Sequence, residues 1–267
     1  MSKKYSRREI LMGVGLVGAG TIACACSASA LLGLWWLNQS PDTSPTQSLV
    51  TALATDSRPI IPQPPIISRA SWGALPPNHD ARNENGFYSA DNPVGWRVYD
   101  VDRHNMYQTI IIHHAAFYEA NDLDTLQEIQ RVHRGNRGWA DLAYHFLIGQ
   151  NGLIYEGRDW QVRGTHVGSY NTGSLGICLL GNFMTQSPTV AQLNSTLSLI
   201  RWATDYFAPT HIASHREFNR QTLCPGDNLY AYMEQFVTAS GLRLGNDGYI
   251  PPDEASACIC CTCDTHI

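Results

Sequence analysis

Short β-branched and aliphatic runs, two of which lead into a histidine, set the strongest limit on how this chain can fold. Residues 109–112 read Thr-Ile-Ile-Ile, which is typical of a strand buried on both faces, and they lead directly into His113 and His114. Four further runs predict strands: 143–148, 153–156, 175–180 and 212–214. An Asn-Gly pair at 151–152, between two of these runs, predicts a β-hairpin.

Segments with a helical pattern lie between and after these runs. We expect three helices, over residues 122–134 with Asp122 or Asp124 as the N-cap and an end at Gly135, over 188–207 with Pro188 in the first turn, and over 228–240. Strands and helices in mixed order predict an α/β fold. We expect a single domain over residues 66–244, with a central mixed β-sheet flanked by helices.

The first 37 residues differ in composition from the rest of the chain. Basic residues within positions 3–8 precede residues 10–37, a run that contains no charged residue. Residues 6–11 read Ser-Arg-Arg-Glu-Ile-Leu, which looks like the twin-arginine signal of the bacterial pathway that exports folded proteins. The apolar run is also long enough to span a bilayer. We therefore expect either a cleaved signal or a retained membrane anchor, and an extracytoplasmic domain in a bacterial cell envelope.

Two further segments flank the predicted domain. Residues 38–65 are rich in Pro, Ser and Thr and have no hydrophobic period, which predicts a linker. Residues 245–267 form a tail with Cys-x-Cys-Cys-x-Cys at 258–263, which suits disulfides, a metal or a poorly ordered end. The net charge of −5, without long basic blocks, argues against nucleic acid as a partner.

Three candidate metal ligands stand at the ends of predicted elements. His113 and His215 each follow a strand, and Cys224 lies in the loop Thr-Leu-Cys-Pro-Gly at 222–226. Two imidazoles and one thiolate suit Zn²⁺, and three protein ligands leave a position for water, as in catalytic zinc sites. The spacing of these residues does not by itself separate a zinc site from two ordinary histidines and a buried cysteine.

The residues around these candidates resemble the peptidoglycan recognition proteins and the related phage lysozyme-type N-acetylmuramoyl-L-alanine amidases. The resemblance covers residues 67–233. Its motifs, in family order, are Ser-Arg-Ala-Ser-Trp-Gly-Ala at 68–74, Ile-Ile-His-His at 111–114, Tyr-His-Phe-Leu-Ile-Gly at 144–149, Ile-Tyr-Glu-Gly-Arg at 154–158, Gly-Thr-His at 164–166, Tyr-Asn at 170–171, Ser-Leu-Gly-Ile at 174–177, Gly-Asn-Phe at 181–183, His-Arg-Glu at 215–217 and Cys-Pro-Gly-Asp at 224–227.

The resemblance implies roles for individual residues. His113, His215 and Cys224 match the family's zinc ligands, and Tyr144 matches the side chain that reaches the metal-bound water or the developing oxyanion. Phage enzymes carry a lysine two residues before the cysteine, whereas this chain has Thr222, which offers only a hydroxyl.

The resemblance also suggests residues that bind substrate. His114 and His166 are candidates for orienting substrate or carrying protons, with a purely supporting role as the alternative. Arg158 and Trp160 lie where the family reads the third residue of the stem peptide. The pair Asp159-Trp160 departs from the usual Gly-Trp and Asn-Phe, and its tryptophan favours diaminopimelate slightly.

The function implied is zinc-dependent hydrolysis of the amide between N-acetylmuramic acid and L-alanine in peptidoglycan. The alternatives are a module that binds peptidoglycan without cutting it and a membrane-tethered structural protein with a zinc-stabilised fold. Members that only bind commonly replace the cysteine, so the resemblance favours catalysis when Cys224 stands beside both histidines and Tyr144.

Overall fold

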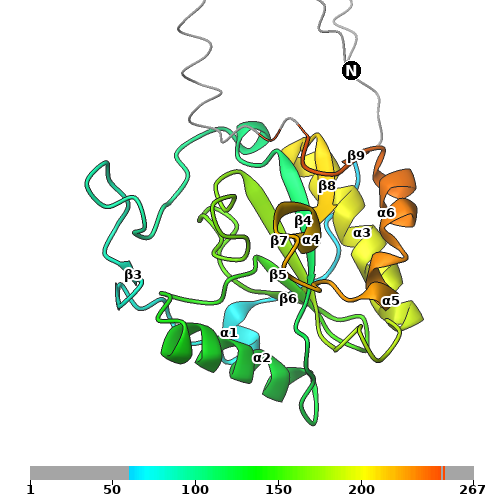
Figure 1. Cartoon of the computed structure of the whole chain (residues 1–267), viewed down its shortest axis with the longest axis horizontal. Helices are drawn as coiled ribbons and strands as arrows, with labels where there is room; N and C mark the ends of the chain where they lie inside the picture. Colours follow the sequence, from blue (N-terminus) through cyan, green and yellow to red (C-terminus); the bar gives the residue numbers. More distant parts are fainter. Residues whose placement is uncertain (1–59, 248, 250–267) are drawn as a thin grey trace, which may run out of the picture. The chain divides into compact units, whose positions relative to one another are not determined.

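The computed structural model describes residues 60–247 and 249, which fold around one seven-stranded sheet with the strand order β1-β6-β5-β7-β4-β8-β9 (Figure 1). Its strands are β1 (Ile66–Ile67), β4 (Thr109–His114), β5 (Phe146–Ile148), β6 (Ile154–Glu156), β7 (Ser174–Leu179), β8 (His211–Ser214) and β9 (Arg243–Leu244). A separate two-stranded ribbon pairs β2 (Asp80–Ala81) with β3 (Glu84–Asn85). The predicted single α/β domain with a mixed central sheet is confirmed.

The sheet is mixed because one hairpin reverses the chain. β4 lies parallel to β7 and β8, β7 lies parallel to β5, and β5 is antiparallel to β6 across the predicted Asn-Gly turn. The predicted hairpin is therefore confirmed. Since β4, β7 and β8 run side by side in one direction, their carboxyl ends meet at one edge of the sheet.

Helices cover the sheet from two sides (Figure 1). They are α1 (Arg69–Trp72), α2 (Asp122–Arg131), α3 (Val190–Phe207), α4 (His215–Phe218), α5 (Asp227–Tyr230) and α6 (Met233–Ser240), with a 3-10 turn at Arg103–Asn105 and a π-helical turn at Val132–Asn136. Ile110 and Ile112 of β4 pack in one core cluster with Ile200 of α3. Leu147 of β5 packs with Leu126 of α2 in a second cluster. Within β5, Phe146 and Ile148 belong to the first cluster and Leu147 to the second, so successive strand residues pack into opposite cores.

The helix ends differ from those expected. Asn121, rather than Asp122 or Asp124, caps α2, since its side chain accepts from the Asp124 N–H. The Asp122 carboxylate instead accepts from Tyr118, Gln150 and Tyr155. The α2 segment continues past Gly135 as the π-helical turn. Two hydrogen bonds hold that turn: the Trp139 N–H donates to the His133 backbone oxygen, and the Ala143 N–H donates to the His133 Nδ1.

The two later helices also depart from the predicted boundaries. Thr189 caps α3, because its hydroxyl accepts from the Gln192 N–H while the Gln192 side chain accepts from the Thr189 N–H, so Pro188 precedes the helix. The single helix expected over 228–240 is divided into α5 and α6. Between them the Tyr232 N–H donates to the oxygen of Leu229, three residues earlier, at 3.0 Å, which marks the break.

Several predictions fall on residues outside those described: the signal or anchor at 1–37, most of the linker at 38–65 and the cysteines at 258–263. Within residues 60–247 and 249, no helix has the length and apolar character needed to cross a membrane.

Candidate metal centre

The register of the sheet brings His113 and His215 to the same edge. Ile112 of β4 lies opposite Ser214 of β8 in a parallel pair. The next residues are His113, near the carboxyl end of β4, and His215, which directly follows β8. Ser214 also begins α4, where the Glu217 carboxylate accepts from the Ser214 N–H at 2.6 Å. This capping fixes the turn on which His215 sits.

The two adjacent histidines of β4 face opposite sides of the sheet, as neighbours in a strand must. His113 lies on the side of Tyr144 and His166, with ring centroids 5.0 Å from each. His114 lies against Phe183 of the α3-side core, and its Nδ1 accepts from the Phe183 N–H at 3.3 Å. The strand thus sends His113 toward the candidate site and His114 toward the core beneath it.

The loop that carries Cys224 is tied to α4. The Arg216 guanidinium donates to the Leu223 oxygen at 2.7 Å and to the Asp227 carboxylate at 2.9 Å, on either side of the cysteine. Within the loop, the Thr222 hydroxyl accepts from the Cys224 N–H at 3.2 Å. The residue that follows His215 therefore positions the third candidate ligand.

These elements bring the three predicted ligands together. The candidate donor atoms of His113, His215 and Cys224 all lie within 4.8 Å of one another, and the Cys224 Sγ is 3.6 Å from the His113 Nδ1. His113 is fully buried and Cys224 is 9% exposed. Nitrogen and sulfur donors without a carboxylate suit zinc, and three of them leave a coordination position for water or substrate. The residues therefore fit the metal that the sequence suggests.

Burial sets the protonation of these donors. It lowers the pKa of His113 well below its usual value, and the neighbouring histidines lower it further. The pKa of His215 is lowered by burial as well. Burial raises the pKa of the Cys224 thiol to about 12. The imidazoles are thus neutral and ready to coordinate, while the thiol must lose its proton as a metal binds.

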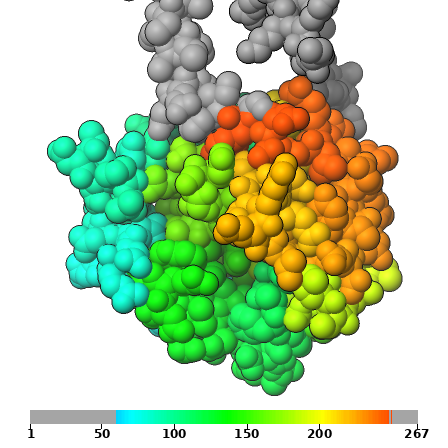
Figure 2. Space-filling view, viewed as in Figure 1, coloured from blue at the N-terminus to red at the C-terminus, as the bar shows by residue number. Residues whose placement is uncertain are grey.

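Tyr144 stands beside the cluster. Its ring centroid lies 5.0 Å from that of His113 and 5.6 Å from that of His133. Burial raises the pKa of the Tyr144 phenol well above its usual value, so the hydroxyl keeps its proton and remains a hydrogen-bond donor. Figure 2 shows this face hollowed between the green part of the chain and the gold segment around α4.

His166 lies behind His113, away from open surface. It is 6% exposed, and its Nδ1 is 3.0 Å from the His113 Nε2. Its Nε2 is 3.2 Å from the Ser174 oxygen. Both ring nitrogens therefore have partners inside the protein.

Arg158 and Trp160 do not join the cluster. Arg158 has no exposed surface, and its guanidinium pairs with the buried Glu84 carboxylate and donates to the Leu142 oxygen. The Trp160 ring packs on Tyr206 and Phe207 of α3. Every polar edge of the Arg158 guanidinium thus has a partner inside the protein.

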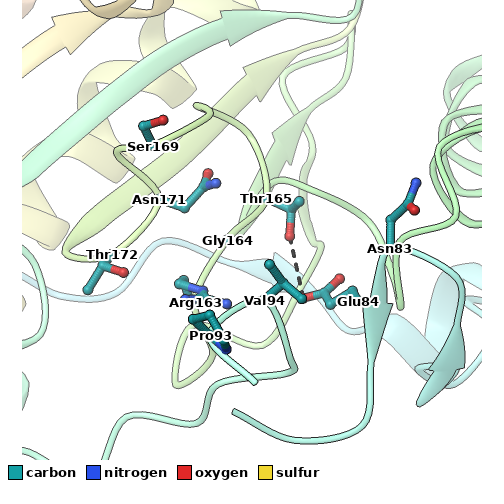
Figure 3. Close-up of a pocket in the computed structure, with 10 residues that line it drawn as sticks. All are labelled: Asn83, Glu84, Pro93, Val94, Arg163, Gly164, Thr165, Ser169, Asn171 and Thr172. Atoms are coloured by element: carbon teal, nitrogen blue, oxygen red, sulfur yellow. Dashed lines mark hydrogen bonds between the residues drawn. The ribbon is translucent and has the colours of Figure 1, made fainter. Parts of the chain in front are cut away.

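A pocket of about 300 Å³ lies beside the segment that leads to His166 (Figure 3). It is lined by Asn83, Glu84, Pro93, Val94, Arg163, Gly164, Thr165, Ser169, Asn171 and Thr172. The Glu84 charge is neutralised by Arg158, so Arg163 gives the lining a positive charge. Sequence reasoning missed both Glu84 and Arg163, because neither belongs to a recognisable motif.

The sheet and the histidine-cysteine cluster define a domain of the N-acetylmuramoyl-L-alanine amidase type, whose family profile matches residues 103–227. Peptidoglycan recognition protein 1 of Bos indicus is 33% identical over 179 residues, which cover 64% of this chain and 83% of that protein. Drosophila peptidoglycan recognition protein SD has a similar structure, with 28% identity, a TM-score of 0.52 and coverage of 65% of this chain and 95% of the other.

Peptidoglycan recognition protein LE, solved with tracheal cytotoxin, a monomeric diaminopimelic acid-type peptidoglycan, gives 29% identity and a TM-score of 0.51. That match covers 64% of this chain and 92% of the LE chain. The chain therefore belongs to the peptidoglycan recognition protein family.

Proposed function

We propose that this protein is a zinc-dependent N-acetylmuramoyl-L-alanine amidase, which hydrolyses the amide between N-acetylmuramic acid and L-alanine in peptidoglycan. The observation that carries the proposal is the convergence of His113, His215 and Cys224 within 4.8 Å. The family match supports peptidoglycan as the substrate class, and the nitrogen and sulfur donors support zinc as the metal.

The roles follow from the chemistry of amide hydrolysis. Bound zinc supplies Lewis-acid polarisation of the carbonyl and an activated water. Tyr144 keeps its proton and donates a hydrogen bond to the charge that develops on the carbonyl oxygen. Thr222 accepts from the Cys224 N–H, which leaves its hydroxyl proton to be donated to the same oxygen.

The pocket of Figure 3 is our candidate for the stem peptide. Stem peptides carry free carboxylates, and Arg163 is a cation that can pair with them. The ligand in the LE structure is a diaminopimelic acid-type peptidoglycan, so we propose the same class of stem peptide here. Thr172→Trp should fill the pocket and weaken binding of such fragments while leaving zinc affinity unchanged. Equal fragment binding by the variant would exclude the pocket.

The alternative is a module that binds peptidoglycan without cutting it. Thr222 favours this reading, because the position lacks the lysine charge of the phage enzymes. Cys224 favours the amidase, because a thiol buried beside His113 has no evident part in binding a polymer. From the sequence of residues 1–37 we also propose export to the cell envelope, which fractionation of cells expressing the full chain would test.

The deciding experiment is digestion of purified peptidoglycan by the zinc-loaded full chain, followed by labelling of newly freed L-alanine amino groups. We expect release by the wild type and by Cys178→Ala, and none by Cys224→Ala. Cys178 is a matched control because it is also a buried cysteine, on β7. A wild-type protein that binds the polymer and zinc but frees no amino groups would establish the binding module instead.

A further inference from the structure

Three groups form an unbroken line of contacts behind the candidate metal centre. The Ser174 backbone oxygen lies 3.2 Å from the His166 Nε2, and the His166 Nδ1 lies 3.0 Å from the His113 Nε2. The remaining ring nitrogen of His113, Nδ1, lies 3.6 Å from the Cys224 Sγ. The line therefore runs from the backbone of β7 to the ligand cluster.

The Ser174 oxygen, at one end of this line, fixes the direction of each hydrogen bond. A backbone oxygen can only accept, so the His166 Nε2 carries the proton that it donates to Ser174. His166 is 6% exposed, and its two ring nitrogens contact only a backbone oxygen and another imidazole. Because burying an unpaired charge is costly, the ring is neutral and its Nδ1 holds a lone pair. The His113 Nε2 must then be the donor to that lone pair. A neutral His113 that carries its proton on Nε2 has a bare Nδ1.

We infer that His166 is a positioning residue, which holds His113 in the Nε2–H form and so presents its Nδ1 toward Cys224 as the metal ligand. The inference rests on the proposed metal centre but names a role that the ligand triad alone does not reveal. Hydrogen bonds of this kind to the distal nitrogen of a ligating histidine fix its tautomer and ring orientation.

The surroundings of His166 are built to hold this ring in place. A Cβ at Gly164 would lie 2.4 Å from the His166 Cδ2, and one at Gly176 would lie 2.7 Å from it. The absence of side chains at both positions therefore makes the slot for the imidazole. The Asn171 side chain accepts from the His166 N–H at 2.8 Å and fixes the backbone as well.

The test compares two substitutions of His166 in the full chain. His166→Leu removes the acceptor, whereas His166→Asn places an amide oxygen near the position of Nδ1 and retains it. His211→Leu is the matched control, because His211 is another buried histidine of the same sheet, with Nδ1 bonded to the Thr210 hydroxyl instead. Zinc affinity is measured by competition with a chromophoric chelator. Zinc that Cys224→Ala still binds is subtracted, so that only zinc bound at the candidate centre is compared.

We expect His166→Leu to lose about 10- to 100-fold in zinc affinity, and His166→Asn and His211→Leu to stay within a few-fold of wild type. Nitrogen-15 NMR of metal-free protein should find His113 protonated on Nε2 in the wild type and in His166→Asn, and on a mixture of both nitrogens in His166→Leu. Wild-type protonation on Nδ1, or unchanged tautomer and affinity in His166→Leu, would overturn the inference.

The tautomer measurement needs neither zinc nor turnover. A wild type that cleaves nothing would therefore refute the amidase and leave this result standing. An active enzyme whose His113 tautomer ignores His166 would refute only the positioning role.

Discussion

The Arg216 guanidinium donates to the Leu223 oxygen at 2.7 Å, and this single bond joins the residue after one proposed zinc ligand to the residue before another. Its partner bond to Asp227 involves a carboxylate side chain that is 70% exposed, where ion pairing contributes little. The carbonyl bond, rather than the ion pair, should therefore hold the Cys224 loop in place.

Arg216→Ala should weaken zinc binding by roughly tenfold, an effect of the size seen when groups that orient a metal ligand are removed. Asp227→Asn is the control and should bind zinc as the wild type does. Competition titration with a chelator measures both. If Asp227→Asn loses as much affinity as Arg216→Ala, the ion pair and not the carbonyl bond holds the loop.

The buried pair of Arg158 and Glu84 should contribute to stability rather than to substrate contact. Glu84→Gln leaves the Arg158 charge buried without its partner, which should lower the free energy of unfolding by about 3–5 kcal/mol. Urea unfolding measures this. Glu128→Gln, which removes a pair with Arg131 on the exposed face of α2, should change little. Equal stability of the two variants would mean that the Arg158 charge is compensated elsewhere.

Tyr144→Phe should retain zinc and lower the rate of amide hydrolysis on the order of 100-fold, because one donor to the developing oxyanion is lost. Tyr155→Phe provides a comparison, since Tyr155 is another sheet tyrosine but bonds to Asp122. It should cleave at the wild-type rate. Full activity of Tyr144→Phe in the free-amine assay would remove Tyr144 from the mechanism.

Stability should fall in acid because of buried neutral histidines. Burial lowers the pKa of His145 to about 3, from 6.5, and its ring accepts from the Gly176 N–H. Below pH 6.5 His145 binds a proton in the unfolded chain, whereas in the folded chain it binds one only near pH 3. The contribution of His145 to the free energy of unfolding is therefore complete above pH 6.5 and is lost as the pH falls toward 3.

This residue alone should add a slope of about 1.4 kcal/mol per pH unit to the unfolding free energy within that window. His145→Asn keeps an acceptor for Gly176 but cannot titrate, so its unfolding free energy should depend less steeply on pH. Urea unfolding at several pH values from about 7 to about 4.5 measures the difference. Parallel pH profiles would show that His145 binds its proton with the same pKa in the folded and the unfolded chain.

Local pattern was sufficient to predict much of the sheet. The run before His113 and the Asn-Gly hairpin both depend on neighbouring residues only, and both are present. That parallel strands deliver His113 and His215 to one edge also follows from their positions at strand ends. The prediction that Cys224 lies near His113 depended on the family resemblance, because the two residues are 111 positions apart and no local pattern indicates their contact.

Tertiary partners explain the rest. Arg158 turns inward because Glu84, 74 residues away, provides a buried carboxylate, and no periodicity connects the two. His114 and His166 seemed equivalent as polar residues near the motif. Strand alternation places His114 on the α3 side, while Gly164 and Gly176, the second of them on a neighbouring strand, leave the slot that encloses His166.

The parallel register of β4 and β8 has a consequence for the proposed export and zinc binding. Two of the three donors take their positions from neighbouring strands, and the third from a loop tied to α4, so the full donor set exists only in the folded chain. A chain exported already folded would leave the cytoplasm with its donors assembled and could acquire its metal there. A chain exported unfolded would have to find zinc outside. For the proposed exported zinc enzyme, the route of export would thus decide which compartment supplies the metal.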